Sequence, residues 1–91
     1  MILGRLAPVE KLASFLLALS ARAAEHKLSA NPLSLPMSRT DIADYLGLTI
    51  ETVSRSFTKL RNTGMIRLPD PQTVELIDMS ALEAVAGINV H

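Results

Sequence analysis

The stretch SRTDIADYLGLTIETVSRSFTKLRNTG, residues 38–64, constrains the fold more than any other part of this chain. Two amphipathic segments flank Gly47, and glycine commonly ends a helix because it takes positive φ at no steric cost. Ser38, with Asp41 three residues later, is an aspartate version of the capping box that marks a helix start. Thr49 supplies a second N-cap residue just after the glycine. The stretch therefore predicts a short helix, a tight turn and a second helix.

The second helix is expected over residues 50–62 and has two different faces. Its apolar stripe consists of Ile50, Val53, Phe57 and Leu60, which recur at helical spacing. Its polar face consists of Glu51, Ser54, Arg55, Thr58, Lys59 and Asn62. In the first helix the expected inward residues are Ile42, Ala43, Tyr45 and Leu46. A short helix, a sharp turn and a longer helix with base-reading side chains form the layout of a DNA-binding helix-turn-helix.

The flanking sequence predicts a helix before this motif and a hairpin after it. A proline in the first turn and apolar residues at helical spacing indicate a helix over 8–25. Leucines that alternate with a serine favour a short edge strand at 33–35. Two further strands are expected over 65–68 and 73–77, and the turn-forming residues 69–72 join them as a hairpin. Their expected inward residues are Ile66, Leu68, Val74 and Leu76.

A last short helix is expected to open at Ser80, with Glu83 three residues later, and to end near Gly87. These elements predict a mainly α fold with a small β-hairpin, which is a winged helix-turn-helix with the hairpin as its wing. We expect one compact domain in two parts. Residues 1–26 form an N-terminal helix preceded by the tail of another helix, and residues 27–91 form the winged helix-turn-helix.

Composition narrows the classes of function. The chain has 91 residues and no cysteine, which excludes disulfides, a thiolate nucleophile and cysteine-bound zinc or iron–sulfur centres. No apolar run approaches the roughly 20 residues that cross a bilayer, and no signal-peptide pattern is present, so we expect a cytoplasmic location. His26 and His91 have no carboxylate at ligand spacing, and no nucleophile–base arrangement occurs. We therefore expect no enzymatic activity, no cofactor and no metal.

The chain carries nine basic and nine acidic residues and so has no net charge, but the two signs are segregated. Between residues 53 and 67 every charged residue is basic, and between 70 and 83 every one is acidic. Screening limits the reach of distant acids to about 10 Å, so a neutral domain can still present a positive face to phosphates. Solvated helix and strand faces are the alternative explanation. The basic run coincides with the expected recognition helix, which favours a nucleic-acid partner.

The polar face of the second helix suits recognition of base edges. Arginine can donate two parallel hydrogen bonds to guanine, and glutamate can accept one from cytosine, so Glu51 and Arg55 could enter one groove together. The alternative is an exposed salt bridge between them, worth about 0.3–0.5 kcal/mol, which could also order the arginine for docking. Hydroxyls and amides near helix N-termini suit phosphate oxygens, which assigns Ser38, Arg39, Thr49 and Thr52 to the DNA backbone. For Ser38 and Thr49, capping alone is an equal alternative.

The run from Asp41 to Arg55, DIADYLGLTIETVSR, resembles the C-terminal domain of CRP/FNR-type bacterial regulators, and within them the FNR/FixK branch most. The likeness extends from about residue 3 to residue 87. It implies that Glu51, Ser54 and Arg55 contact base edges of a TTGA-like half-site, with Arg55 on guanine. The positions implied to contact phosphates are Arg39, Thr40, Thr49 and Thr52, and we add Ser38 and Lys59 to this group.

The likeness also has limits. Where the catabolite-activator branch has an arginine this chain has Ile50, which argues against that branch's TGTGA preference. The wing carries Pro69-Asp70-Pro71-Gln72 in place of a lysine or glycine–lysine, which leaves Arg67, Gln72 and Thr73 as weak candidates for phosphate contact. Of the family's sensing domain and dimerisation helix, the sequence shows only a remnant at Met1–Arg5.

We therefore expect sequence-specific binding of double-stranded DNA and regulation of transcription. The expected partners are a pseudo-palindromic operator, a second copy of the chain and RNA polymerase. The alternative is a protein-interaction domain that keeps the winged-helix fold without independent DNA binding. The short N-terminal remnant motivates this alternative, because a single half-site contact binds weakly at physiological salt.

Overall fold

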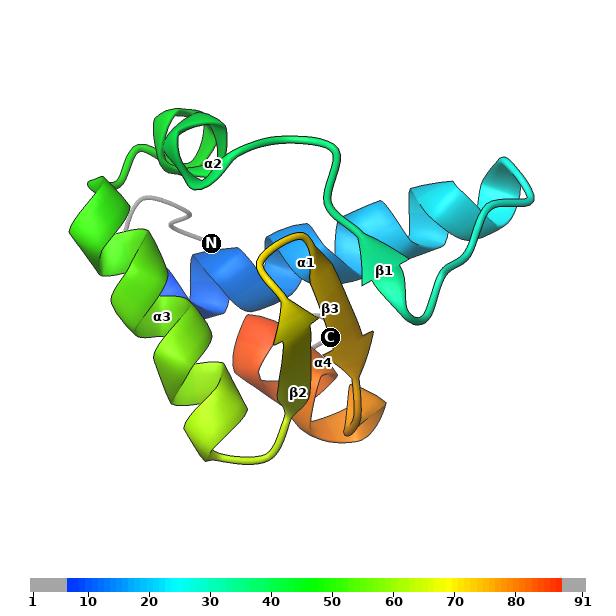
Figure 1. Ribbon diagram of the computed structural model, residues 1–91. Helices are drawn as coiled ribbons and strands as arrows, with labels where there is room; N and C mark the ends of the chain where they lie inside the picture. Colours follow the sequence, from blue (N-terminus) through cyan, green and yellow to red (C-terminus); the bar gives the residue numbers. More distant parts are fainter. Residues whose placement is uncertain (1–6, 88–91) are drawn as a thin grey trace.

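The computed structural model describes residues 7–87, which form four helices and three short strands (Figure 1). In chain order these are α1 (Pro8–Glu25), β1 (Leu33–Ser34), α2 (Arg39–Leu46), α3 (Ile50–Asn62), β2 (Ile66–Asp70), β3 (Thr73–Leu76) and α4 (Met79–Ala86). The predicted fold class, mainly helical with a small sheet, is confirmed. The expected helical tail at Met1–Arg5 lies outside the described residues, as does His91, and the division at residue 26 stays a prediction.

The sheet is antiparallel and has the order β1-β3-β2. Leu33 pairs with Val74, and Ile66 pairs with Leu76, so three of the four predicted inward residues of the hairpin, Ile66, Val74 and Leu76, lie buried on one face. The fourth, Leu68, lies where the register of the ladder shifts and is half-buried. The hairpin turn is shorter than expected because β2 continues through Pro69 and Asp70. The turn of the wing thus comprises only Pro71 and Gln72 between the two strands.

Helix α1 is the centre of the core. It contacts α3, α4 and β1, and Figure 1 shows it crossing behind the hairpin. The fully buried side chains come from every helix and from β2 and β3: Leu12, Leu16, Ile42, Val53, Leu60, Ile66, Val74 and Leu82. Apolar side chains from all four helices and two strands share one core. The buried face of α3 packs on this core, which fixes the position of the helix. No helix within residues 7–87 is long and apolar enough to cross a membrane.

Two residues expected to face inward are instead exposed. The side chain of Ile50 is 46% exposed and that of Tyr45 is 77% exposed. The buried stripe of α3 is Val53, Ser56, Phe57 and Leu60. Ile50 has the right helical phase, but it lies one turn before the core begins. The Tyr45 ring contacts the ring of Phe15 in α1, and the two ring centroids are 5.5 Å apart.

The cap of the last helix also differs from the prediction. Helix α4 begins at Met79 with Asp78 as its N-cap residue, and the Asp78 carboxylate accepts a hydrogen bond of 3.0 Å from the Ala81 amide. Ser80 therefore lies inside the first turn. Aspartate and serine are comparable N-cap residues, so local preference alone did not separate the two positions. The predicted end at Gly87 is confirmed, with φ of 73°.

Candidate nucleic-acid interface

The turn between α2 and α3 has the tight geometry that a helix-turn-helix needs. Gly47 adopts φ of 72° and ψ of 35°, in the left-handed region. The Leu48 amide donates to the Ala43 carbonyl at 2.8 Å and so closes the end of α2. Ala43 is 2% exposed and Val53 is fully buried, so small and apolar side chains fill the crossing between the helices. The turn fixes the direction in which α3 leaves α2.

The start of α2 has the predicted capping box. The Asp41 amide donates to Ser38 Oγ at 3.1 Å, and the Ser38 amide donates to Asp41 Oδ2 at 3.4 Å. Capping uses an acceptor position of the Ser38 hydroxyl and leaves its proton available to a phosphate oxygen. Thr40 follows in the first turn and is exposed. Capping and phosphate contact are therefore compatible at this helix end.

The start of α3 holds a chain of hydroxyl groups that reaches the predicted base-reading arginine. Thr49 Oγ1 accepts from the Thr52 amide at 3.2 Å and lies 2.8 Å from Thr52 Oγ1. Arg55 Nη2 in turn donates to Thr52 Oγ1 at 3.5 Å, which is a long hydrogen bond. The arginine is thus oriented loosely by the cap of its own helix and stays free to move onto a base.

The three predicted base-contacting residues, Glu51, Ser54 and Arg55, are all exposed on α3. The salt bridge considered for Glu51 and Arg55 is not formed. Within residues 7–87 the structure has one ion pair, between Arg67 and Glu75 of the hairpin, at 3.4 Å. Both side chains of the α3 pair are therefore open to other partners. Lys59 is exposed about one turn beyond Arg55 on the same helix.

Arg39 has a partner that the sequence did not predict. Its Cζ atom lies 3.9 Å from the centroid of the Phe57 ring, which places the guanidinium over the aromatic face. Phe57 was expected only as a core residue, and it is 2% exposed. Burial lowers the pKa of the half-buried Arg39 side chain by desolvation. Spacing along the chain gave no signal for this contact, because it joins two helices across the turn.

The first turn of α1 adjoins this surface. Ala7, Pro8 and Val9 line a shallow hollow of about 260 Å³ together with four residues of α3: Thr52, Arg55, Ser56 and Lys59. From the sequence, we expected α1 only to pack in the core. Its start lies beside the residues that are predicted to contact DNA.

The tip of the wing is acidic. Asp70 Oδ1 accepts from the Gln72 amide at 2.8 Å, and Asp70 Oδ2 accepts from the Thr73 hydroxyl at 3.0 Å. Arg67 lies opposite Glu75 in the ladder and forms its ion pair with it. Of the weak candidates for phosphate contact, the Arg67 side chain and the Thr73 hydroxyl are therefore already engaged within the hairpin, and Gln72 is engaged through its backbone amide. The exposed carboxylate at the tip repels phosphates.

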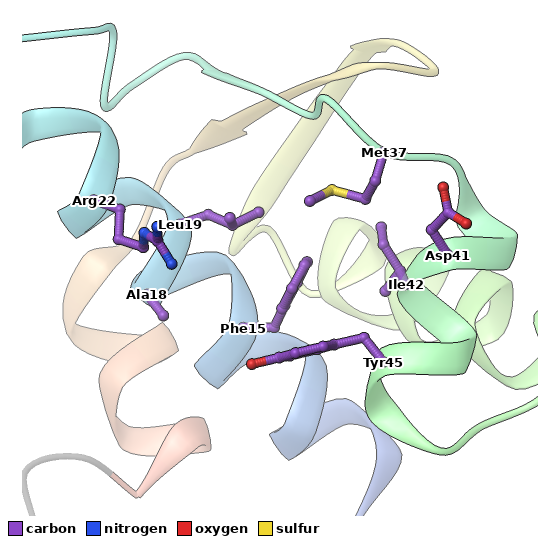
Figure 2. A pocket seen from close by; sticks show the side chains of 8 residues that line it. All are labelled: Phe15, Ala18, Leu19, Arg22, Met37, Asp41, Ile42 and Tyr45. Atoms are coloured by element: carbon purple, nitrogen blue, oxygen red, sulfur yellow. The ribbon is translucent and has the colours of Figure 1, made fainter. Parts of the chain in front are cut away.

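A further hollow lies elsewhere, between α1 and α2 (Figure 2). It has a volume of about 350 Å³ and is mostly apolar, lined by Phe15, Ala18, Leu19, Arg22, Met37, Asp41, Ile42 and Tyr45. Its one carboxylate, on Asp41, already accepts the Ser38 amide in the capping box. No cluster of three or more potential metal ligands occurs among the residues that the structure describes.

Comparison with known proteins agrees with this geometry. Residues 10–85 match the family described as Crp-like helix-turn-helix domains. The chain is 46% identical over 87 residues to the nitrogen fixation regulation protein FixK of Rhizobium meliloti, covering 96% of this chain and 39% of that protein. It is 41% identical over 87 residues to the transcriptional activator protein FnrA of Stutzerimonas stutzeri, covering 96% and 35%.

A solved structure of FixK2 from Bradyrhizobium japonicum has the same fold. It superposes with a TM-score of 0.81 at 38% identity, covering 91% of this chain and 40% of that one. The chain thus spans about two fifths of the length of FixK, which it covers to 39%. The similarity therefore concerns one domain of longer regulators.

Proposed function

The chain belongs to the family of Crp-like helix-turn-helix domains, and on this premise we propose that it binds double-stranded DNA sequence-specifically and regulates transcription. Helix α3 enters the major groove of a TTGA-like half-site. The observation that carries this proposal is the exposure of Glu51, Ser54 and Arg55 together, without an ion pair between Glu51 and Arg55, on a helix whose other face is buried.

In the proposed complex these three side chains read base edges. Arg55 donates two hydrogen bonds to guanine O6 and N7, and Glu51 accepts one from the cytosine paired with that guanine. The Ser54 hydroxyl can either donate or accept, so it contributes to whichever neighbouring base presents the complementary group. The long contact of 3.5 Å between Arg55 and Thr52 is weak enough to be exchanged for these stronger bonds.

The surrounding groups fix the register of the helix on the phosphate backbone. Ser38, Arg39 and Thr40 at the start of α2 form one anchor. Thr49 and Thr52 at the start of α3 form a second anchor, and Lys59 forms a third. These contacts carry no sequence information, but they supply most of the affinity and make it depend on salt.

A homodimer places two α3 helices about 34 Å apart on a pseudo-palindromic operator. RNA polymerase is the partner through which such a regulator acts on transcription. These steps belong to the chromosome of a bacterium, and hence to the cytoplasm. The mechanism contains no catalytic step.

The test is a titration of the chain against two duplexes, one carrying an inverted TTGA repeat and one with the same bases shuffled. Each titration is run at two salt concentrations, about 50 and 200 mM, because phosphate contacts lose affinity steeply over this interval. We expect tighter binding to the repeat and a fall in affinity with salt. The absence of binding at the lower salt concentration, or equal affinity for both duplexes, would reject the proposed function.

A further inference from the structure

We propose that Phe57 is a positioning residue for DNA binding, because its ring holds the Arg39 guanidinium ready for a phosphate at the edge of the groove. This inference rests on the proposed function, in which Arg39 is one of the phosphate contacts. Phe57 itself touches no DNA. It acts through the arginine.

The contact joins two elements with different tasks. Arg39 is the first residue of α2, whereas Phe57 lies in the middle of α3, and the guanidinium carbon is 3.9 Å from the ring centroid. The ring is 2% exposed and packed in the core, so it is a rigid platform. A guanidinium stacked on it loses much of the rotamer freedom of a long, solvated side chain.

The electrostatic setting of Arg39 is unfavourable without an anion. A positive charge in the first turn of a helix opposes the helix dipole, which favours anions at that end. Burial also lowers the pKa of this side chain, which reports a cost of keeping it charged there. Among the described residues, no carboxylate pairs with Arg39 and none accepts a hydrogen bond from its guanidinium. A phosphate group at this position would remove the imbalance.

The stacked geometry leaves the hydrogen-bonding capacity of Arg39 unused. The guanidinium has five N–H groups, and none of those of Arg39 hydrogen-bonds to a described residue, so they remain available to an anion while the guanidinium carbon lies over the ring. A phosphate can therefore be bound without breaking the stack. Since the guanidinium is ordered before binding, less side-chain entropy is lost on association. The stack also links Arg39, the phosphate-binding residue of α2, to α3. The position of α2 on the DNA backbone and the position of α3 in the groove are therefore set together.

The experiment is a double-mutant cycle measured as DNA affinity over a salt series. The four proteins are the parent, Arg39→Ala, Phe57→Leu and the double variant, each titrated with the inverted-TTGA duplex. Leucine keeps an apolar side chain in the core but offers no aromatic face. Phe15→Leu is the matched control, because it removes the other phenylalanine ring of the chain, which packs against Tyr45 and is not the ring under Arg39.

We expect Arg39→Ala to weaken binding about tenfold and to reduce the slope of log affinity against log salt by about one phosphate contact. Phe57→Leu should cause most of the same loss and lower the slope in the parent. In the Arg39→Ala background it should change neither quantity further. Phe15→Leu should leave the slope unchanged.

A purely structural role of Phe57 predicts a different result. If the ring only stabilised the fold, Phe57→Leu would scale the affinity equally at every salt concentration, leave the slope intact and act equally in both backgrounds. That outcome overturns the positioning role while the proposed function stands. If the parent itself shows no salt-dependent binding, both proposals fail together.

Discussion

Asn31 and Leu76 exchange two hydrogen bonds across 45 residues of sequence. Asn31 Nδ2 donates to the Leu76 carbonyl and Asn31 Oδ1 accepts from the Leu76 amide, each at 2.9 Å. The Asn31 side chain thereby extends the pairing of β1 with β3. It provides hydrogen-bond partners for the backbone amide and carbonyl of Leu76, the last residue of β3. A loop after α1 is thus tied directly to the hairpin that follows the recognition helix.

Replacing Asn31 should therefore destabilise the whole domain. We expect Asn31→Ala to lower the free energy of unfolding by about 1–3 kcal/mol, because two half-buried backbone groups of Leu76 lose their partners. Asn31→Asp should cost less than the alanine change, since a carboxylate can still accept from the amide. Urea denaturation followed by circular dichroism measures both variants. Equal stability of parent and Asn31→Ala would contradict a structural role for this pair.

The turn glycine offers a test of backbone geometry alone. Gly47 has φ of 72°, and a Cβ atom added there would meet no other atom within 4 Å. Gly47→Ala should therefore cost only the conformational penalty of the left-handed region, about 1–2 kcal/mol. Gly47→Asn should cost less, because asparagine tolerates this region better. Chemical denaturation of the parent and the two variants measures their order of stability. A Gly47→Ala variant as stable as the parent would contradict the prediction.

The base-reading role of Arg55 predicts a loss of both affinity and discrimination. Arg55→Ala should weaken binding to the TTGA duplex by about 1–3 kcal/mol and relax the preference at one base pair. Arg61→Ala is the matched control, because Arg61 is also exposed on α3 but is not among the proposed contacts. It should alter affinity only slightly and leave the preference intact. Competition binding with duplexes substituted at each half-site position measures this. Unchanged discrimination after Arg55→Ala would remove Arg55 from the base contacts.

The acidic tip of the wing should oppose DNA binding. Asp70→Asn keeps an acceptor for the Gln72 amide while removing the charge, so the turn should persist. We expect affinity to rise about two- to threefold at low salt and the gain to vanish near 1 M salt, where the screening length is only about 3 Å. Glu25→Gln is the control, because Glu25 ends α1 on the side away from α3 (Figure 1). An equal gain from both variants would point to net charge and not to the wing.

Much of the fold could be predicted because its signals are local. The capping box of Ser38 and Asp41, the left-handed Gly47 and the cap by Thr49 each depend on a few neighbouring residues, and the structure has all three. Periodicity likewise placed Val53, Phe57 and Leu60 in the core. At the start of α4 the prediction of Ser80 as the capping residue was wrong, because Asp78 caps the helix.

The sequence by itself thus determined which segments form helices and strands, and which polar residues share the free face of α3. Only the tertiary structure decided which apolar positions are covered, because Ile50 and Tyr45 were both expected to face inward but remain exposed, Tyr45 despite the contact of its ring with Phe15. It also decided that Arg39 lies on Phe57, that Asn31 joins β3, and that Glu51 and Arg55 remain unpaired. The Arg39–Phe57 and Asn31–β3 contacts join residues from different elements. The charges of Glu51 and Arg55 are exposed, so water competes with an ion pair between them. Their energy therefore depends on how the helices are placed in space, which periodicity and caps do not encode.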